Sequence, residues 1–251
     1  SQEIGFLYFS YAEPNKHNPN WKTIGYPGPI GLPDDVGDAK ILNTLLVRST
    51  TVLHCDTVVI GSGAGGGVVA AELARSGQKV IVVEKGPYLK DKDLNQREHD
   101  MLSQLFERRA AITSMNGSVS VFAGSGMGGG TLINWAGAFR TPDYILHEWA
   151  TEHGNPHFID PEYIKCFEAI EKRTGINTKL KRHNPQNQAL LDGCQKLGYH
   201  AEQIPRNELV EGYENGKDNI LWKKCGYGTL GDSFGQKQST TKTFLQDASD
   251  Y

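Results

Sequence analysis

The sequence predicts an α/β fold with a doubly wound parallel sheet. Three stretches predict it: an apolar run at 55–60, a glycine-rich turn at 61–67 followed by helical spacing, and a second apolar run at 79–84. Strand, helix and strand within about thirty residues make a βαβ unit. A continuous apolar run is typical of a parallel strand buried on both faces. The unit therefore predicts a Rossmann-like fold.

The elements of this unit follow from the residue spacing. The first strand is Cys55–Ile60, and the second is Lys79–Glu84. Between them, residues 68–76 have the apolar spacing of a helix, and Gly77 ends it. Before them, residues 1–50 mix aromatic side chains with prolines, so few regular elements are expected in that segment.

Downstream, the apolar spacing predicts mostly helices. The helix expected at 95–112 has its apolar positions at Met101, Leu102, Leu105, Phe106 and Ile112. A short strand at 119–122 leads into a second glycine cluster at 124–130. The remaining expectations are helices at 143–153, 161–173 and 184–198, and a polar, turn-rich surface segment from Ala201 to Lys224.

Composition and charge exclude several classes of protein. The net charge is −3, and the basic residues form no stripe, which excludes a nucleic-acid-binding surface. No stretch approaches the ~20 apolar residues that span a bilayer. The cysteines have no CxxC pair and no metal-ligand spacing, so we expect thiols in a reducing compartment and no metal site. The four cysteines are Cys55, Cys166, Cys194 and Cys225. Neither end resembles a finished terminus, so the chain is expected to be a fragment.

The glycine-rich turn meets the pattern GxGxxG with Gly61, Gly63 and Gly66. It follows a strand and opens a helix, and Glu84 stands 23 positions after Gly61, at the end of the next strand. In this context Gly61 makes the tight turn and Gly63 admits a pyrophosphate, while Gly66 lets the helix pack closely on the sheet. The helix N-terminus attracts the phosphates, and Glu84 accepts hydrogen bonds from a ribose.

A purely structural role for these glycines is the alternative. Five glycines in seven residues cost backbone entropy unless a ligand needs close approach, which favours binding. The motif alone fits FAD and NAD equally. A second cluster, Gly124–Thr131, continues into Asn134, and a loop of small residues with a polar end suits a flavin ring, so FAD is favoured. A glycine-rich turn without a ligand remains the alternative there.

Two long segments resemble the glucose–methanol–choline (GMC) oxidoreductase superfamily. They are CDTVVIGSGAGGGVVAAELARSGQKVIVVEKG at 55–86 and AGSGMGGGTLINWAGAFRTP at 123–142. Three further stretches are similar to the long-chain (fatty) alcohol oxidases of that superfamily: NPNWKTIGYPGP, HNPQNQALLDGCQKLGY and CGYGTLGDSFGQKQSTTKTFLQDA. The resemblance implies an incomplete FAD-binding fold with part of a substrate domain. Its divisions would be an N-terminal extended segment at 1–50, the FAD-binding core at 51–142, and a truncated helical and substrate-domain portion at 143–251.

The resemblance also implies which residues bind FAD. They are Gly61, Ser62, Gly63, Ala64, Gly65, Gly66, Glu84, Lys85, Gly124, Ser125, Gly128, Gly129, Gly130, Thr131, Asn134 and Trp135. The family's catalytic pair, a His with a second His or Asn, would lie beyond residue 251, so no catalytic residue is assigned. His147 and His153 are interpreted as surface or packing residues, and no Gly-x-Ser-x-Gly motif is present.

The activity implied by the resemblance is oxidation of a long-chain primary alcohol to the aldehyde, with oxygen as acceptor giving hydrogen peroxide. The implied location is intracellular, at a membrane, the peroxisome or the endoplasmic reticulum. Two alternatives stay open. One is a GMC-type dehydrogenase that uses another electron acceptor, and the other is a non-catalytic truncated paralogue that binds nucleotide.

Overall fold

The computed structural model describes residues 18–26, 42–180, 183–209 and 228–251, and these residues form two compact units. One unit contains the chain up to Trp135 together with residues 228–251, and the other begins at Ala136. The division at residues 50 and 142 stays a prediction. The boundary between the two compact units falls after Trp135, and the last segment of the chain packs against the glycine-rich loops of the first unit.

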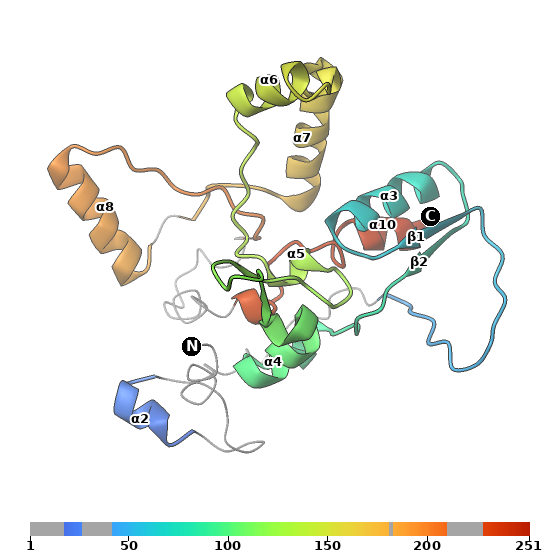
Figure 1. Ribbon diagram of the computed structural model, residues 1–251, viewed down its shortest axis with the longest axis horizontal. Coiled ribbons are helices and arrows are strands. Elements are labelled where there is room, and N and C mark those ends of the chain that lie inside the picture. The colour runs from blue at the N-terminus through green and yellow to red at the C-terminus, as the bar shows by residue number, and fades with distance from the viewer. Residues whose placement is uncertain (1–17, 27–41, 181–182, 210–227) are drawn as a thin grey trace. The chain divides into compact units, whose positions relative to one another are not determined.

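The predicted βαβ unit is present in the first unit (Figure 1). Strand β1 (Thr57–Ile60) pairs in parallel with β2 (Val80–Val83), and helix α3 (Ala64–Arg75) connects them. The register places Thr57 beside Val80 and Ile60 beside Val83. This parallel pair and its crossover helix confirm the Rossmann-like fold class.

Helix α3 begins at Ala64, four residues earlier than the apolar spacing predicted. Gly65, Gly66 and Gly67 therefore lie inside the helix, although glycine is a poor helix former. Close packing explains the difference. A Cβ at Gly66 would overlap the Gly61 carbonyl oxygen, and a Cβ at Gly67 would lie 2.9 Å from Thr240 Cβ.

The strands are less buried than a continuous apolar run predicts. Val59 is buried, whereas Val58 and Ile60 are 53% and 87% exposed. In the part of the chain that the structure describes, this sheet has two strands, and α3 packs on it as the crossover helix. The face that carries Val58 and Ile60 consequently remains open to solvent.

The prediction of one helix at 95–112 is wrong for its second half, which is not α-helical. Helix α4 spans Glu98–Leu105 and is followed by a 3-10 turn at Glu107–Ala110. Arg108, Arg109 and Ala110 all have positive φ, which an α-helix cannot continue through. The next residues form β3 (Ile112–Thr113), antiparallel to β4 (Ser120–Val121).

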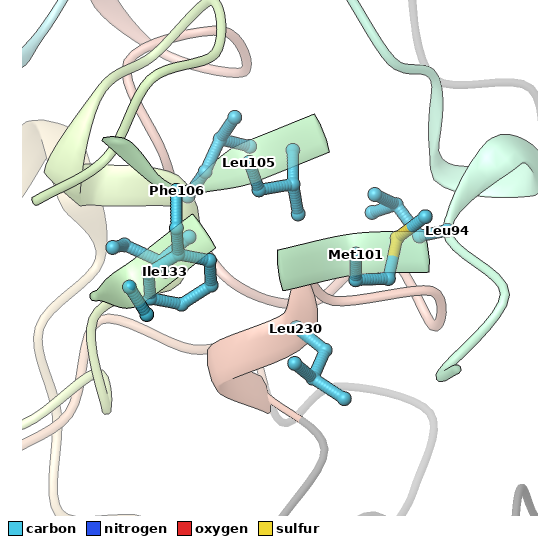
Figure 2. Packing of buried hydrophobic residues seen from close by; sticks show 8 residues of the cluster. Leu94, Met101, Leu105, Phe106, Ile133 and Leu230 are labelled. Carbon is cyan, nitrogen blue, oxygen red and sulfur yellow. The ribbon is translucent and has the colours of Figure 1, made fainter. Parts of the chain in front are cut away.

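A hydrophobic cluster, shown in Figure 2, packs against the second glycine cluster: Leu105 and Leu132 lie 3.3 and 3.4 Å from the Cβ position of Gly126. Helix α4 and the turn after it contribute half of its buried side chains. The others come from α5 (Gly130–Ile133), from the 3-10 turn η4 (Gly228–Leu230) and from Leu94, which precedes α4. The buried members are Leu94, Met101, Leu105, Phe106, Ala110, Leu132, Ile133 and Leu230. The burial of Met101, Leu105 and Phe106 confirms three of the apolar positions expected for this segment.

The last segment of the chain packs against α3. Helix α10 spans Phe244–Asp250, and the nearest side-chain atom of Phe244 lies 3.7 Å from the Cβ position of Gly67. The buried positions of α3 are all small: Gly67, Ala70, Ala71 and Ala74. Small side chains let a second helix approach the axis of α3 closely, so this packing explains the glycine and alanine content of α3.

In the described residues of the second unit, three α-helices lie where the sequence predicted helices. They are α6 (Asp143–Thr151), α7 (Pro161–Thr174) and α8 (Pro185–Leu197). Asn184 caps α8 by accepting a hydrogen bond from Asn187 N at 2.8 Å. Aromatic rings pack in series between α6 and α7, and the Arg140 guanidinium binds Glu171 through two hydrogen bonds of 2.6 and 2.7 Å.

The N-terminal segment contains one short helix in its described part. Helix α2 spans Asn20–Ile24 and buries Trp21. Most of residues 1–50, the end of the surface segment predicted to Lys224, and Cys225 lie outside the described residues. Across the described ranges, no helix is both long enough and apolar enough to cross a bilayer.

Candidate cofactor site

The turn between β1 and α3 has the geometry that its glycines predicted. Gly61 has a φ of +91°, a left-handed conformation that favours glycine. Gly66 lies against the Gly61 carbonyl with no room for a side chain. The predicted roles of Gly61 in the turn and of Gly66 in helix packing are therefore confirmed.

The backbone of the same turn is accessible at the N-terminus of α3. Apart from adjacent residues, no atom lies within 4 Å of the Cβ position of Gly61 or Gly65. At the Cβ position of Gly63, the nearest atom is Gly129 Cα at 3.9 Å. The first amides of a twelve-residue helix have no intrahelical acceptor. An anion that approaches Gly63 thus meets backbone N–H groups and the positive end of the helix dipole.

Ser62 is the point at which the parts of the site meet. Its side chain is fully buried, and its hydroxyl and amide donate to Glu84 Oε2 at 2.5 and 3.0 Å. Its hydroxyl also accepts from Gly128 N at 2.9 Å, and its carbonyl oxygen accepts from Thr240 Oγ1 at 2.9 Å. Ser62 therefore joins the two glycine loops and the last segment of the chain, and its assignment to FAD stays a prediction.

Glu84 is held at the end of β2 in its charged form. Burial raises the pKa of this carboxyl, and it is the largest single effect. Four hydrogen bonds lower the pKa, from the Ser62 hydroxyl and from the amides of Gly86, Ser62 and Lys85. Together they outweigh the effect of burial, so the pKa of Glu84 lies below its ordinary value. A carboxylate fixed beside the glycine turn is the acceptor that a ribose diol requires.

The second glycine cluster packs directly on the first. A Cβ at Gly129 would lie 2.9 Å from Gly63 Cα, and a Cβ at Gly124 would overlap the backbone of Gly129. Gly86, which follows Glu84 closely, has the same restriction against the Ser125 carbonyl. Glycine is required at Gly86, Gly124 and Gly129 by these approaches, and the two loops lie backbone against backbone.

Lys85 lies at the rim of this surface. Its ammonium forms an ion pair with Glu107, whose pKa is lowered first by that hydrogen bond and then by the charge of Lys85. The Lys85 side chain is 70% exposed. A contact of Lys85 with a cofactor stays a prediction.

The end of α5 presents two of the predicted residues to solvent. Asn134 and Trp135 are both exposed, and Trp135 is 83% exposed. No atom lies within 4 Å of the Cβ position of Gly130 at the start of α5. Thr131, by contrast, uses its hydroxyl internally, donating to the Gly128 carbonyl at 2.5 Å.

Two residues that organise the site were missed in the sequence. Thr240 N donates to Thr131 Oγ1 at 3.1 Å, while Thr240 Oγ1 donates to the Ser62 carbonyl. Lys237 is 2% exposed and directs its ammonium to backbone carbonyls around α5. The available signal was the four small hydroxyl residues Ser239, Thr240, Thr241 and Thr243, which suit packing against a glycine backbone.

The histidines interpreted as ordinary residues lie in the second unit. His147 Nδ1 is 2.9 Å from the Asp143 carbonyl, and His153 Nε2 is 3.8 Å from Glu148 Oε1. Both contacts are exposed. Within the described ranges, no group of three or more His, Cys, Asp or Glu side chains is arranged to hold a metal ion.

The residues present fit FAD. The open backbone at Gly63 and the N-terminus of α3 suit a pyrophosphate, and the carboxylate of Glu84 suits the adenosine ribose. Gly129 lies against Gly63, and Asn134 is exposed at the end of α5. When bound, FAD would itself accept hydride from a substrate.

Comparisons with known proteins agree with this geometry. Residues 56–91 match the family model described as FAD binding domain, and residues 102–251 match the one described as GMC oxidoreductase. FAD is therefore the cofactor of this fold.

Three long-chain-alcohol oxidases of Arabidopsis thaliana are similar to the chain over 97% of its length. FAO1 is 34% identical, and FAO3 and FAO4B are each 33% identical. The aligned region covers 34% of FAO1 and 35% of each of the other two. The chain thus spans about a third of the length of these relatives.

Proposed function

Because the chain belongs to the GMC oxidoreductase family, we propose that it is the FAD-binding part of an enzyme that oxidises a long-chain primary alcohol to the aldehyde. The similarity to long-chain-alcohol oxidases over 97% of the chain supports the substrate class. The observation that carries the cofactor half of the proposal is the bridge at Ser62, which holds Glu84 and Gly128 in one hydrogen-bonded unit.

The residues of this chain have defined parts in the proposed reaction. The N-terminus of α3 and Gly63 hold the pyrophosphate, and Glu84 orients the adenosine ribose. Asn134, at the exposed end of α5, would contact the flavin ring and help to orient it. The base that accepts the hydroxyl proton is not assigned to a residue of this chain.

We propose oxygen as the electron acceptor, with hydrogen peroxide as the second product. The test uses the full gene product loaded with FAD and a series of primary alcohols of increasing chain length. Aldehyde and peroxide are measured in air and, separately, without oxygen in the presence of an artificial electron acceptor. Equal amounts of aldehyde and peroxide in air, with rates that increase with chain length, are the expected result.

Two other outcomes identify the alternatives. Aldehyde that forms only with the artificial acceptor indicates a GMC-type dehydrogenase. Tight FAD binding without turnover of any alcohol indicates a non-catalytic nucleotide-binding paralogue. Rates independent of chain length contradict the proposed substrate class and leave the FAD site unaffected.

We also propose that the protein works inside the cell at a membrane, in the peroxisome or in the endoplasmic reticulum. The support is the substrate class, since long-chain alcohols partition into lipid. Fractionation of cells that express a tagged full gene product tests this. Recovery of the protein in the medium contradicts it.

A further inference from the structure

A buried lysine from the last segment of the chain lies against the end of helix α5. The Lys237 ammonium donates to the carbonyl oxygens of Leu132 at 3.0 Å, Asn134 at 2.6 Å and Gly228 at 2.5 Å. An ammonium has three protons, so these three acceptors match its donors. We propose that Lys237 is a positioning residue for the flavin, which fixes the end of α5 so that Asn134 faces the ring.

The end of α5 needs such support. This helix has only four residues, and a helix of that length is not stable by itself. Its last carbonyls have no acceptor role within the helix. The chain then turns extended at Asn134, with ψ at 167°, and passes through Ala136 with a φ of +60°. A cation at a helix C-terminus both bonds these carbonyls and interacts favourably with the dipole.

Lys237 is itself held at both ends. Its backbone amide donates to Asp232 Oδ2 at 2.6 Å, and the same carboxylate accepts from the amides of Phe234 and Gln236. Asp232 thus fixes the loop from which the side chain extends. The side chain then reaches 105 positions back along the sequence to Leu132. A fixed main chain and a fully engaged ammonium leave the side chain little freedom.

Burial of a cation argues for a specific requirement. Removing an ammonium from water is unfavourable unless its hydrogen bonds replace the lost hydration. An apolar side chain of the same length would fill the space at lower cost, but the carbonyls of Leu132 and Asn134 would lose a donor. The inference rests on the FAD site and is independent of the alcohol and the acceptor proposed above.

The test compares Lys237→Met with Lys237→Arg in the full gene product. Two properties are measured: the Kd for FAD, by titration of the apoprotein, and the visible absorption band of the bound flavin. Lys237→Met is expected to weaken FAD binding at least tenfold and to shift the band or change its fine structure. Lys237→Arg retains the charge, but its planar group suits convergent carbonyls poorly, so partial recovery is expected.

Lys242→Met is the matched control. Lys242 belongs to the same segment, and its side chain is 15% exposed, but its ion pair with Asp91 of 2.9 Å lies outside the glycine loops. This variant is expected to lose thermal stability while the flavin band and the Kd stay at wild-type values. A change of the flavin band in this control as large as in Lys237→Met overturns the proposal.

A wild-type band and Kd in Lys237→Met also overturn it. Where Lys237→Met is insoluble, Lys237→Gln decides on the same two measurements, because its amide keeps two donors. Failure of both variants to fold assigns Lys237 a structural role alone and likewise overturns the proposal. Absence of FAD from the wild-type protein is a different failure, since it removes the cofactor site itself.

Discussion

The Ser62 hydroxyl donates to Glu84 Oε2 at 2.5 Å and accepts from Gly128 N at 2.9 Å. A single buried oxygen therefore connects the first glycine loop to the end of β2 and to the second glycine loop. Ser62→Ala should leave the Gly128 amide without this acceptor and cost roughly 1–3 kcal/mol of stability. It should also weaken FAD binding, because the two loops lose their register.

Thermal melting and FAD titration of Ser62→Ala measure both effects. Ser76→Ala is a suitable control, since the Ser76 hydroxyl makes one exposed hydrogen bond to the Leu73 carbonyl at the end of α3. An unchanged FAD Kd in Ser62→Ala would show that the loops keep their register without the bridge.

Gly63→Val should abolish FAD retention. The Cβ position has only Gly129 Cα within 4 Å, at 3.9 Å, so the fold tolerates a methyl group there. The γ-carbons of valine, however, would occupy the place of the pyrophosphate. Gly63→Ala is expected to fold and to bind FAD weakly, and Gly63→Val is expected to fold without it. Flavin absorbance per protein after gel filtration provides the measurement, and full flavin content in Gly63→Val refutes the assignment.

Neighbouring glycines in α3 should respond oppositely to alanine. A Cβ at Gly66 overlaps the Gly61 carbonyl, so Gly66→Ala should cost at least about 1–3 kcal/mol and displace the first turn of the helix. Gly65 has free space around its Cβ position, so Gly65→Ala should stabilise the apoprotein by roughly 0.5–1 kcal/mol. Denaturant unfolding of the two apoproteins measures the difference. Equal destabilisation by both changes would contradict the packing described for Gly66.

Thr240→Val should separate the shape of this side chain from its hydrogen bonds. Valine retains the contact with Gly67 but loses the hydroxyl that bonds the Ser62 carbonyl. A loss of roughly 1–3 kcal/mol is expected, because a buried carbonyl loses its donor. Thr240→Ser keeps the hydroxyl and should retain more of the stability despite its smaller volume. The opposite order of the two melting temperatures would show that packing outweighs hydrogen bonding at this position.

Two carboxyl groups should make opposite contributions to the pH dependence of stability. The pKa of Glu84 is lowered, so its contribution is present above the unfolded pKa and is lost as pH falls through the folded pKa. Burial raises the pKa of Glu98 despite a hydrogen bond from Tyr26, so the contribution of Glu98 is present at low pH and is lost as pH rises.

Melting curves from about pH 3 to pH 8 test both signs. Glu84→Gln should flatten the acid side of the stability profile, whereas Glu98→Gln should raise the Tm near neutral pH by a few degrees at most. Gln at position 98 still accepts a hydrogen bond from Tyr26. A lower Tm for Glu98→Gln at neutral pH contradicts the raised pKa of Glu98.

The sequence predicted the parts of the site that depend on local pattern. The spacing of Gly61, Gly63 and Gly66 before a helix, with Glu84 after the next strand, was sufficient to predict the βαβ unit and its ligand class. Residues 106–112 were predicted incorrectly. The backbone becomes extended at Phe106 and then passes through three consecutive residues with positive φ, and Arg108 and Arg109 give no local signal for that conformation. The roles of Lys237 and Thr240 depend on contacts more than a hundred positions away, which no local pattern encodes.

The hydrogen bond from Thr240 to the Ser62 carbonyl joins residues 178 positions apart. During synthesis, the glycine turn leaves the ribosome long before its partner is translated. The cofactor pocket therefore cannot be completed until the segment from Lys237 onward has emerged and folded back. Nascent chains that stall before Lys237 would expose the glycine loops to chaperones without this hydrogen bond.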